Sequence, residues 1–138
     1  MAVYREEFYI ETRGEADMID ITDKVREIVR RSGIKDGIVN VFCPGSTCAV
    51  STIEYEPGLL KDFPRILERI APRDIEYEHH KRWGDYNGHS HVRSALIKPS
   101  FTAPVVDGDV LLGTWQQITF IELDVRPRRR RIVVSVVG

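Results

Sequence analysis

The chain has 138 residues, of which 42% are hydrophobic and 30% are charged, and its formal net charge is −1 at pH 7. This length and composition predict one globular domain over residues 1–138 and exclude a disordered or fibrous chain. The small net charge excludes a general electrostatic attraction to nucleic acid or to anionic membranes. No basic segment with a following apolar core opens the sequence, and no apolar run approaches the roughly 20 residues of a membrane span. A soluble, cytoplasmic protein without a nucleic-acid or membrane partner is therefore expected.

The first half of the chain alternates strand patterns with two helix patterns. Thr22 is the predicted N-cap of the first helix, and Gly33 is predicted to end it because glycine adopts a left-handed backbone freely. Pro64 is predicted to kink the second helix or to separate its first turn. The predicted elements are strands over 4–12 and 18–21, a helix over 22–33, strands over 37–42 and 49–53, and a helix over 58–70.

The second half begins with a polar segment, residues 71–90, which has little periodicity and is predicted to be a long loop. A short helix over 91–97 follows, and Asp107-Gly108 between apolar runs predicts a hairpin. The remaining predicted strands cover 101–106, 110–112, 117–125 and 132–137. Together these patterns predict an α+β fold, with a mostly antiparallel β-sheet and about two helices. The apolar runs 118–121 and 132–137 risk being exposed strand edges, which contacts between subunits would cover.

All four histidines lie within a short polar segment, at His79, His80, His89 and His91. Neutral imidazole is a preferred ligand of zinc and related divalent ions, and Asp85 between the two pairs could complete or orient a metal site. His89 and His91 would point the same way in an extended segment and would diverge at the start of a helix. We predict a metal site here. A histidine-rich surface loop is the alternative, because no metalloprotease-type spacing fixes the geometry.

A turn of small residues, Pro44–Thr47, separates two predicted strands. Its backbone N–H groups and two hydroxyls would form an anion-binding nest, although a plain structural turn explains these residues equally well. The lysine and the glycine spacing of a nucleotide-binding P-loop are missing. Glu54, which ends the next strand, could act as a general base or support a metal ligand, and the alternative is a strand-end acid in water. Cys43 and Cys48 flank the turn and are predicted to be packed thiols, with a disulfide as the alternative.

Two further motifs lie in the C-terminal third. Trp115, in the segment Gly113–Gln117, would either stack on a planar ligand or fill the core, and the core is its commoner fate. Five arginines occupy position 126 and positions 128–131. Pro127 interrupts them, two acids precede them and no aromatic platform accompanies them, so a solvated turn with one or two arginine–acid pairs is predicted rather than a nucleic-acid site.

Several strings taken together resemble one known family over nearly the whole chain. They are YEH at 77–79, WGDYNGHSH at 83–91, GTWQ at 113–116, and Glu122 with the closing arginine-rich strand. This combination is similar to the YjbQ-like family, which is often labelled as secondary thiamine-phosphate synthase. The resemblance implies a compact α+β fold that assembles as a homotrimer with sites near the subunit interfaces.

The resemblance also implies which residues form the site. It makes His79 and His91 the metal pair, whereas His80 and His89 fall at positions that vary in the family. Many relatives have a histidine where this chain has Gly45, a departure that favours a plain phosphate-cradling turn. The catalytic residues that it implies are Glu54, Asp85, Asn87 and Gln116, and the phosphate-binding residues are Gly45, Ser46 and Thr47.

The function implied by this label is an enzyme that joins a pyrimidine methyl diphosphate to a thiazole phosphate and releases pyrophosphate. A divalent metal would neutralise the leaving diphosphate. Two histidines indicate zinc, while such chemistry usually uses magnesium held by oxygen ligands, which is the alternative. The other hypotheses are a metal-dependent hydrolase of a small phosphorylated molecule and a non-catalytic trimeric protein that binds one.

Overall fold

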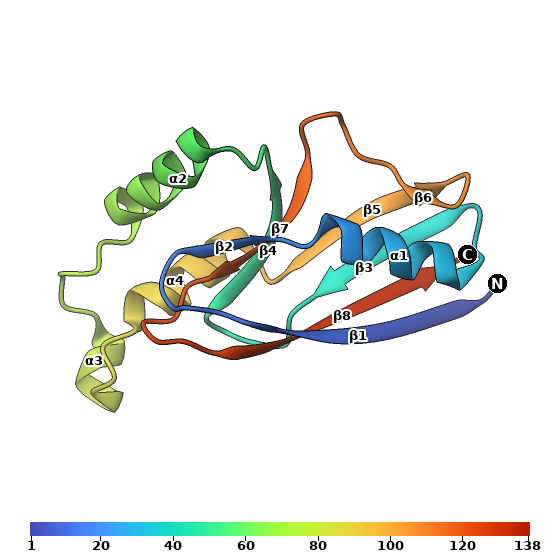
Figure 1. Ribbon diagram of the computed structural model, residues 1–138. Coiled ribbons are helices and arrows are strands. Elements are labelled where there is room, and N and C mark those ends of the chain that lie inside the picture. The colour runs from blue at the N-terminus through green and yellow to red at the C-terminus, as the bar shows by residue number, and fades with distance from the viewer.

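The computed structural model describes residues 1–138 and contains eight strands and four helices (Figure 1). They are β1 (Val3–Glu11), β2 (Asp17–Asp20), α1 (Thr22–Ser32), β3 (Gly37–Phe42), β4 (Cys48–Ile53), α2 (Pro57–Ile70), α3 (Glu78–Trp83), α4 (Gly88–Ile97), β5 (Ser100–Val106), β6 (Asp109–Val110), β7 (Gln117–Glu122) and β8 (Arg129–Val137). Both termini lie at one end of the molecule, and α2 and α3 lie at the other (Figure 1). The histidine-rich segment is therefore far from the termini.

The strands form two antiparallel sheets, a five-stranded one in the order β1-β8-β3-β5-β6 and a three-stranded one in the order β2-β7-β4. β8 lies between β1 and β3, and β7 lies between β2 and β4. The apolar runs 118–121 and 132–137 are thus inside the sheets. The prediction that they risk being exposed edges is wrong, because strands from distant parts of the chain pair with both sides of each.

Strand β7 supplies side chains to both hydrophobic cores. The main core packs α1 against the five-stranded sheet and includes Ile118 and Phe120 of β7, while a smaller core near α2 includes Ile121 of the same strand. Because both faces of β7 are covered, its sequence is a nearly continuous apolar run rather than an alternation. Strand β7 ends at Glu122, and Asp124 follows two positions later; both residues belong to the site described below.

The predicted α+β class and the predicted order of elements are confirmed, with element ends displaced by at most three residues. Gly33 ends α1 with a left-handed φ of 70°, as predicted. Thr22 is not the N-cap, since Ile21 holds that position. The Thr22 hydroxyl donates to Asp20 and accepts the N–H of Ile118, so it joins α1 to the sheet instead of capping the helix.

Helix α2 is continuous through Pro64, so the predicted separate first turn does not form. Proline also opens this helix at Pro57, where a missing N–H is tolerated. The carboxylate of Glu56 caps it by accepting the N–H groups of Gly58 and Leu59 at 2.8 and 2.5 Å.

The main error lies in residues 71–90, which were predicted to be a loop. They contain all of α3 and the first three residues of α4, so the chain has four helices rather than about two. No residue of α3 is buried, and the first turn of α4 buries polar residues. Neither segment therefore carries the apolar periodicity that identifies a helix. No helix of the structure has both the length and the apolar character needed to cross a membrane.

Candidate functional site

His79 of α3 and His91 of α4 come together, with ring centroids 4.6 Å apart and ring planes inclined at 41°. The chain reverses between the two helices after Gly84, which ends α3 in a left-handed conformation. Gly88 then allows α4 to start close to α3, because a Cβ at this position would lie 2.7 Å from the Cβ of Tyr77. The backbone of this connection therefore brings the two histidines together. We call residues 77–94 the α3–α4 corner.

The other two histidines have partners inside the protein. His80 Nε2 accepts the N–H of Gly88 at 3.1 Å. His89 is fully buried, and its Nε2 hydrogen-bonds to the carboxylate of Glu15. Two positions apart in a helix, His89 and His91 point about 200° apart, which is the divergence predicted for a helix start. Of the four histidines, His79 and His91 thus belong to the candidate site, whereas His80 and His89 have structural partners.

Unpartnered polar atoms concentrate in the same corner. The buried side-chain atoms without a hydrogen-bond partner are His79 Nδ1, Asn87 Oδ1, His89 Nδ1 and Ser90 Oγ, together with one atom elsewhere, Arg26 Nε. Leaving such an atom unsatisfied costs about 1–3 kcal/mol, and most buried polar atoms in proteins are bonded. Asp85 Oδ1 lies 3.6 Å from His79 Nδ1, too far for a hydrogen bond. The corner therefore holds buried polar atoms whose hydrogen-bonding capacity the protein does not use.

Asp124, which follows β7, is a site residue that the sequence analysis missed. Its carboxylate accepts hydrogen bonds from Asn87 Nδ2 at 3.3 Å, Thr47 Oγ1 at 3.2 Å and Arg128 Nη1 at 2.7 Å. Burial alone would raise the pKa of Asp124, but the Val125 N–H and these three partners hold it below its ordinary value. Asp124 therefore ties the start of α4 to the β3–β4 turn.

Behind that turn, Arg130 and Glu122 form a buried ion pair, with exposed fractions of 6% and 0% for the two side chains. Arg130 Nη2 also donates to the carbonyl and the hydroxyl oxygen of Thr47 at 3.1 and 2.9 Å. Four of the five arginines form ion pairs, more than the one or two predicted: Arg128–Asp124, Arg129–Glu11, Arg130–Glu122 and Arg131–Glu7. Arg130 is nevertheless not in a solvated turn, because β8 already includes this position and directs the side chain inward.

The predicted phosphate-binding residues have different surroundings. The Thr47 hydroxyl is buried and engaged by Asp124 and Arg130, so it is not available to a ligand. A Cβ at Gly45 would lie 3.0 Å from Arg130 Nη1, so the backbone packs tightly against the guanidinium. Ser46 is exposed beside them. Of the two hydroxyls in the turn, only that of Ser46 faces solvent.

Cys43 and Cys48 are buried free thiols, as predicted. The hydrogen bond between the two thiols, together with burial, raises the pKa of Cys43. Cys43 is therefore a neutral packing residue rather than a nucleophile.

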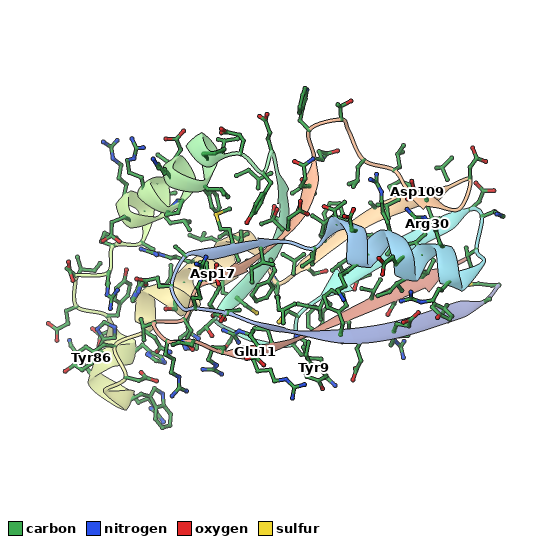
Figure 2. All side chains as sticks on the ribbon, viewed as in Figure 1. Tyr9, Glu11, Asp17, Arg30, Tyr86 and Asp109 are labelled. Atoms are coloured by element: carbon green, nitrogen blue, oxygen red, sulfur yellow. The ribbon has the colours of Figure 1, made fainter.

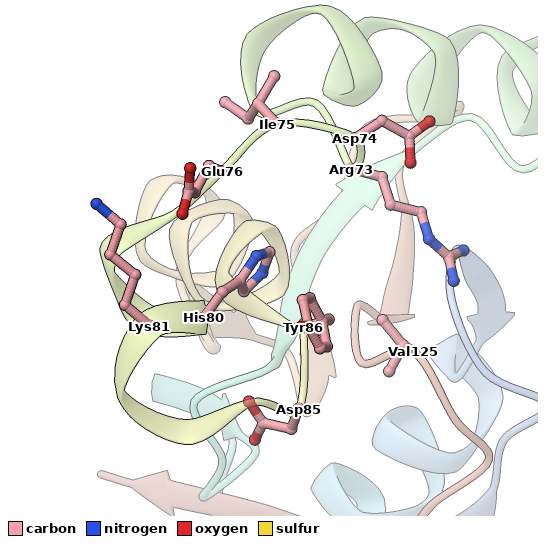
Figure 3. Close-up of a pocket in the computed structure, with 9 residues that line it drawn as sticks. All are labelled: Arg73, Asp74, Ile75, Glu76, His80, Lys81, Asp85, Tyr86 and Val125. Carbon is pink, nitrogen blue, oxygen red and sulfur yellow. The ribbon is translucent and has the colours of Figure 1, made fainter.

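Three hollows lie around the α3–α4 corner. One of about 480 Å³ is lined by Gly45, Ser46, His91, Ser94 and Lys98, among others. A second, of about 360 Å³, is lined by Asp85, Asn87, Asp124, Val125 and Arg126. The largest, of about 630 Å³, lies against α3, with His80, Asp85 and Tyr86 facing Arg73 and Val125 across it (Figure 3). Tyr86 stands at the outer edge of the corner (Figure 2). His91 lines the first of these hollows, whereas His79 lines none of the three.

Two of the predicted catalytic residues, Glu54 and Gln116, lie elsewhere in the chain. Ile53, at the end of β4, pairs with Gln117, whereas Cys48, at its start, lies beside α4. Glu54 and Gln116 therefore lie at the opposite end of the three-stranded sheet from His91. Gln116 accepts the N–H of Gly113, and Trp115 beside it is 69% exposed rather than in the core.

Acidification is expected to reduce stability through His91. Burial, and secondarily the neighbouring His79, lower the pKa of His91 below its usual 6.5. The unfolded chain then binds this proton more readily, so the stabilisation from neutral His91 is full above pH 6.5 and declines as the pH falls toward the lowered value. Urea unfolding from pH 7.5 to 5 should show a shallower decline for His91→Gln than for the wild type. Equal slopes would contradict this prediction.

Comparison with known proteins now identifies the family. The family model described as UPF0047 protein YjbQ-like matches residues 6–138. A UPF0047 protein of Methanothermobacter thermautotrophicus is 45% identical over 138 residues, which cover 100% of this chain and 94% of the relative. One of Archaeoglobus fulgidus is 37% identical, covering 94% and 98% of the two chains. The chain belongs to the UPF0047 (YjbQ-like) family.

Solved structures have the same fold. The crystal structure of a YbjQ-like protein of unknown function from Sulfolobus solfataricus superposes with a TM-score of 0.93 at 33% identity, covering 99% of this chain and 98% of that one. A YjbQ/UPF0047 protein from Clostridium acetobutylicum gives a TM-score of 0.85 at 30% identity, covering 96% and 99%.

These findings correct the predicted function. The family description and the names of these relatives state no activity, and the structural relative from Sulfolobus solfataricus is described as being of unknown function. The chain itself gathers no group of three or more His, Cys, Asp or Glu side chains that could hold a metal ion. The prediction of a metal-dependent thiamine-phosphate synthase is therefore wrong.

Proposed function

We propose that the protein holds a divalent transition-metal ion at His79 and His91 and binds a small phosphorylated molecule beside it. The observation that supports this is the approach of the two imidazole rings to 4.6 Å in a corner with unpartnered polar atoms. Imidazole nitrogen suits zinc and related ions, whereas magnesium prefers oxygen ligands, so zinc is the favoured ion.

One chain supplies two histidine ligands for such an ion, and no third His, Cys, Asp or Glu joins them in a group that could hold it. His79 and His91 would be its ligands, the Asp85 carboxylate lies 3.6 Å from His79 Nδ1, and Asn87 Oδ1 is a buried acceptor without a partner in the same corner. The remaining positions would fall to solvent, to the bound molecule or to a neighbouring subunit. A metal ion in this position supplies positive charge that attracts a phosphate group.

Removing either histidine is expected to abolish tight zinc binding. The dialysed wild type should bind about one zinc ion per chain. His79→Ala or His91→Ala should weaken zinc binding by more than roughly 100-fold, which exceeds the loss typical of a residue that only orients a metal ligand. Isothermal titration calorimetry and elemental analysis measure both quantities. His80→Gln is the matched control, because it removes an imidazole but keeps an acceptor for the Gly88 N–H. Unchanged zinc binding by His91→Ala, or none by the wild type, would refute the proposal.

We further propose that three chains form a closed ring that completes the site. Large apolar side chains are exposed at Val92 and Leu96 of α4 and at Trp115, and monomers seldom expose many such groups together. A head-to-tail contact between these two regions would be heterologous and could close into a ring. It would bring Glu54 and Gln116 of one chain toward the histidine pair of the next.

Two buried free thiols also suit a reducing compartment such as the cytoplasm.

The ring is tested by mass. Light scattering of the purified protein should give three times the 15.9 kDa of one chain, and Leu96→Glu should lower that mass. Ser32→Glu, on a helix away from the proposed contact, is the control and should leave the mass unchanged. A wild type with the mass of one chain would refute the ring and leave the histidine proposal to its own test.

A further inference from the structure

Lys98 follows the last residue of α4 with φ 86° and ψ 144°, a backbone conformation that residues other than glycine rarely adopt. Its neighbours impose this conformation. The Lys98 N–H donates to the Ser94 carbonyl at 2.8 Å, and its carbonyl accepts the N–H of Val50 at 3.1 Å. The carbonyl of Pro99 accepts the N–H of Cys43 at 3.0 Å. Glycine would adopt this conformation without strain, so the strain is a cost that the side chain of Lys98 brings to the fold.

Lys98 lines the hollow of about 480 Å³ that is also lined by His91 and by Ser46 of the β3–β4 turn. None of the residues that line this hollow is acidic, and Lys98 is the only lysine or arginine among them. The hollow therefore has a positive charge without an opposing carboxylate, which favours an anion.

Two donors that line the hollow, one in the β3–β4 turn and one at the end of α4, make no hydrogen bond within the protein. The Ser94 hydroxyl already donates to the carbonyl of Cys48, and the N–H of Gly45 donates to the carbonyl of Cys43. The hydroxyl of Ser46 and the ammonium of Lys98 are left to a ligand. An ammonium is a compact point charge that binds phosphate well, and several phosphate oxygens can accept from separate donors at once.

We propose that Lys98, together with Ser46, recognises the phosphate group of the ligand beside His91. This rests on the proposed function and deepens it, because it names a phosphate group rather than a carboxylate as the part of the ligand bound here. It also assigns the charge at this site to Lys98, which lies outside the turn predicted to bind phosphate.

The test is calorimetric titration of the full chain with inorganic phosphate, and separately with acetate. Lys98→Met should weaken phosphate binding about tenfold or more, the loss expected for a hydrogen bond to a charged group. Lys98→Arg should retain most of the affinity. Lys98→Gly should lose phosphate binding while raising the melting temperature, because glycine accepts the positive φ. Lys61→Met, which removes an exposed lysine of α2, is the control and should change neither quantity.

Titration of the same variants with zinc separates this inference from the proposed function. Lys98→Met should bind zinc like the wild type. The phosphate affinity of metal-free His79→Ala, compared with that of the double variant His79→Ala/Lys98→Met, gives the contribution of Lys98 to phosphate binding whether or not the metal site exists. Unchanged phosphate affinity in Lys98→Met would overturn the inference. So would a wild type that binds no phosphate, or one that binds acetate as tightly as phosphate.

Discussion

Replacing Arg130 with methionine is expected to lower the free energy of unfolding by about 3–5 kcal/mol, the usual loss when one partner of a buried ion pair is removed. Arg130 Nε and Nη2 donate to the two carboxylate oxygens of Glu122 at 2.8 and 2.5 Å. Without the guanidinium, a fully buried carboxylate would keep only the neutral donors Thr12 Oγ1 and the N–H of Asp124. Urea denaturation followed by circular dichroism measures the difference.

Two further variants show whether the uncompensated carboxylate causes this loss. Arg131→Met removes an exposed arginine 3.5 Å from Glu7 and should cost no more than about 1 kcal/mol. Adding Glu122→Leu to Arg130→Met should recover part of the stability, because a buried pair can be exchanged for apolar side chains at little cost. A double variant less stable than Arg130→Met alone would contradict this explanation.

Truncating Phe120 to alanine is expected to cost about 3–5 kcal/mol, as for other large aromatic side chains in cores. Phe120 is fully buried in the main core, on the central strand of the three-stranded sheet. The void cannot collapse easily, because β2 and β4 hold the backbone of β7 on both sides. Denaturation measured by tryptophan fluorescence and by circular dichroism should give the same midpoint.

Trp115→Ala is the matched control for this truncation. It removes a larger aromatic ring, but one that is 69% exposed in the single chain. It should therefore change the unfolding free energy of the isolated chain by less than about 0.5 kcal/mol. A loss close to that of Phe120→Ala, measured in a monomeric background such as Leu96→Glu, would contradict the difference in burial.

The fold was largely predictable because most strands are apolar runs bounded by turn residues. The pattern of β7 was read correctly as a strand, and the Asp107-Gly108 turn joins β5 and β6 as expected. Strand neighbours were not predictable, because β8 joins β1 and β3, which lie about a hundred positions earlier in the chain. Helix α3 was missed for the opposite reason, since it buries nothing and so carries no periodic signal.

The candidate site was predictable in its residue types and less so in its geometry. Four histidines close in sequence suggested one cluster, but helical spacing turns His80 and His89 toward structural partners. Asp124 gave no signal, because its importance depends on contacts with Asn87 and with Thr47, which lies 77 positions away. The packing of the two sheets sets the burial and the contacts of Asp124, and a local sequence pattern carries no information about that packing.

The absence of buried residues in α3 has a consequence for how tightly any ligand binds. His91 stands on a helix anchored by buried residues, whereas His79 stands on six residues with no hold on either core. Such a segment opens locally at little free-energy cost, so its amide hydrogens should exchange with solvent much faster than those of α4. A ligand that contacts both histidines must hold the opening segment closed, and its apparent affinity falls by the fraction of time the segment is open. Slower exchange in residues 78–83 would therefore be a direct signature of binding.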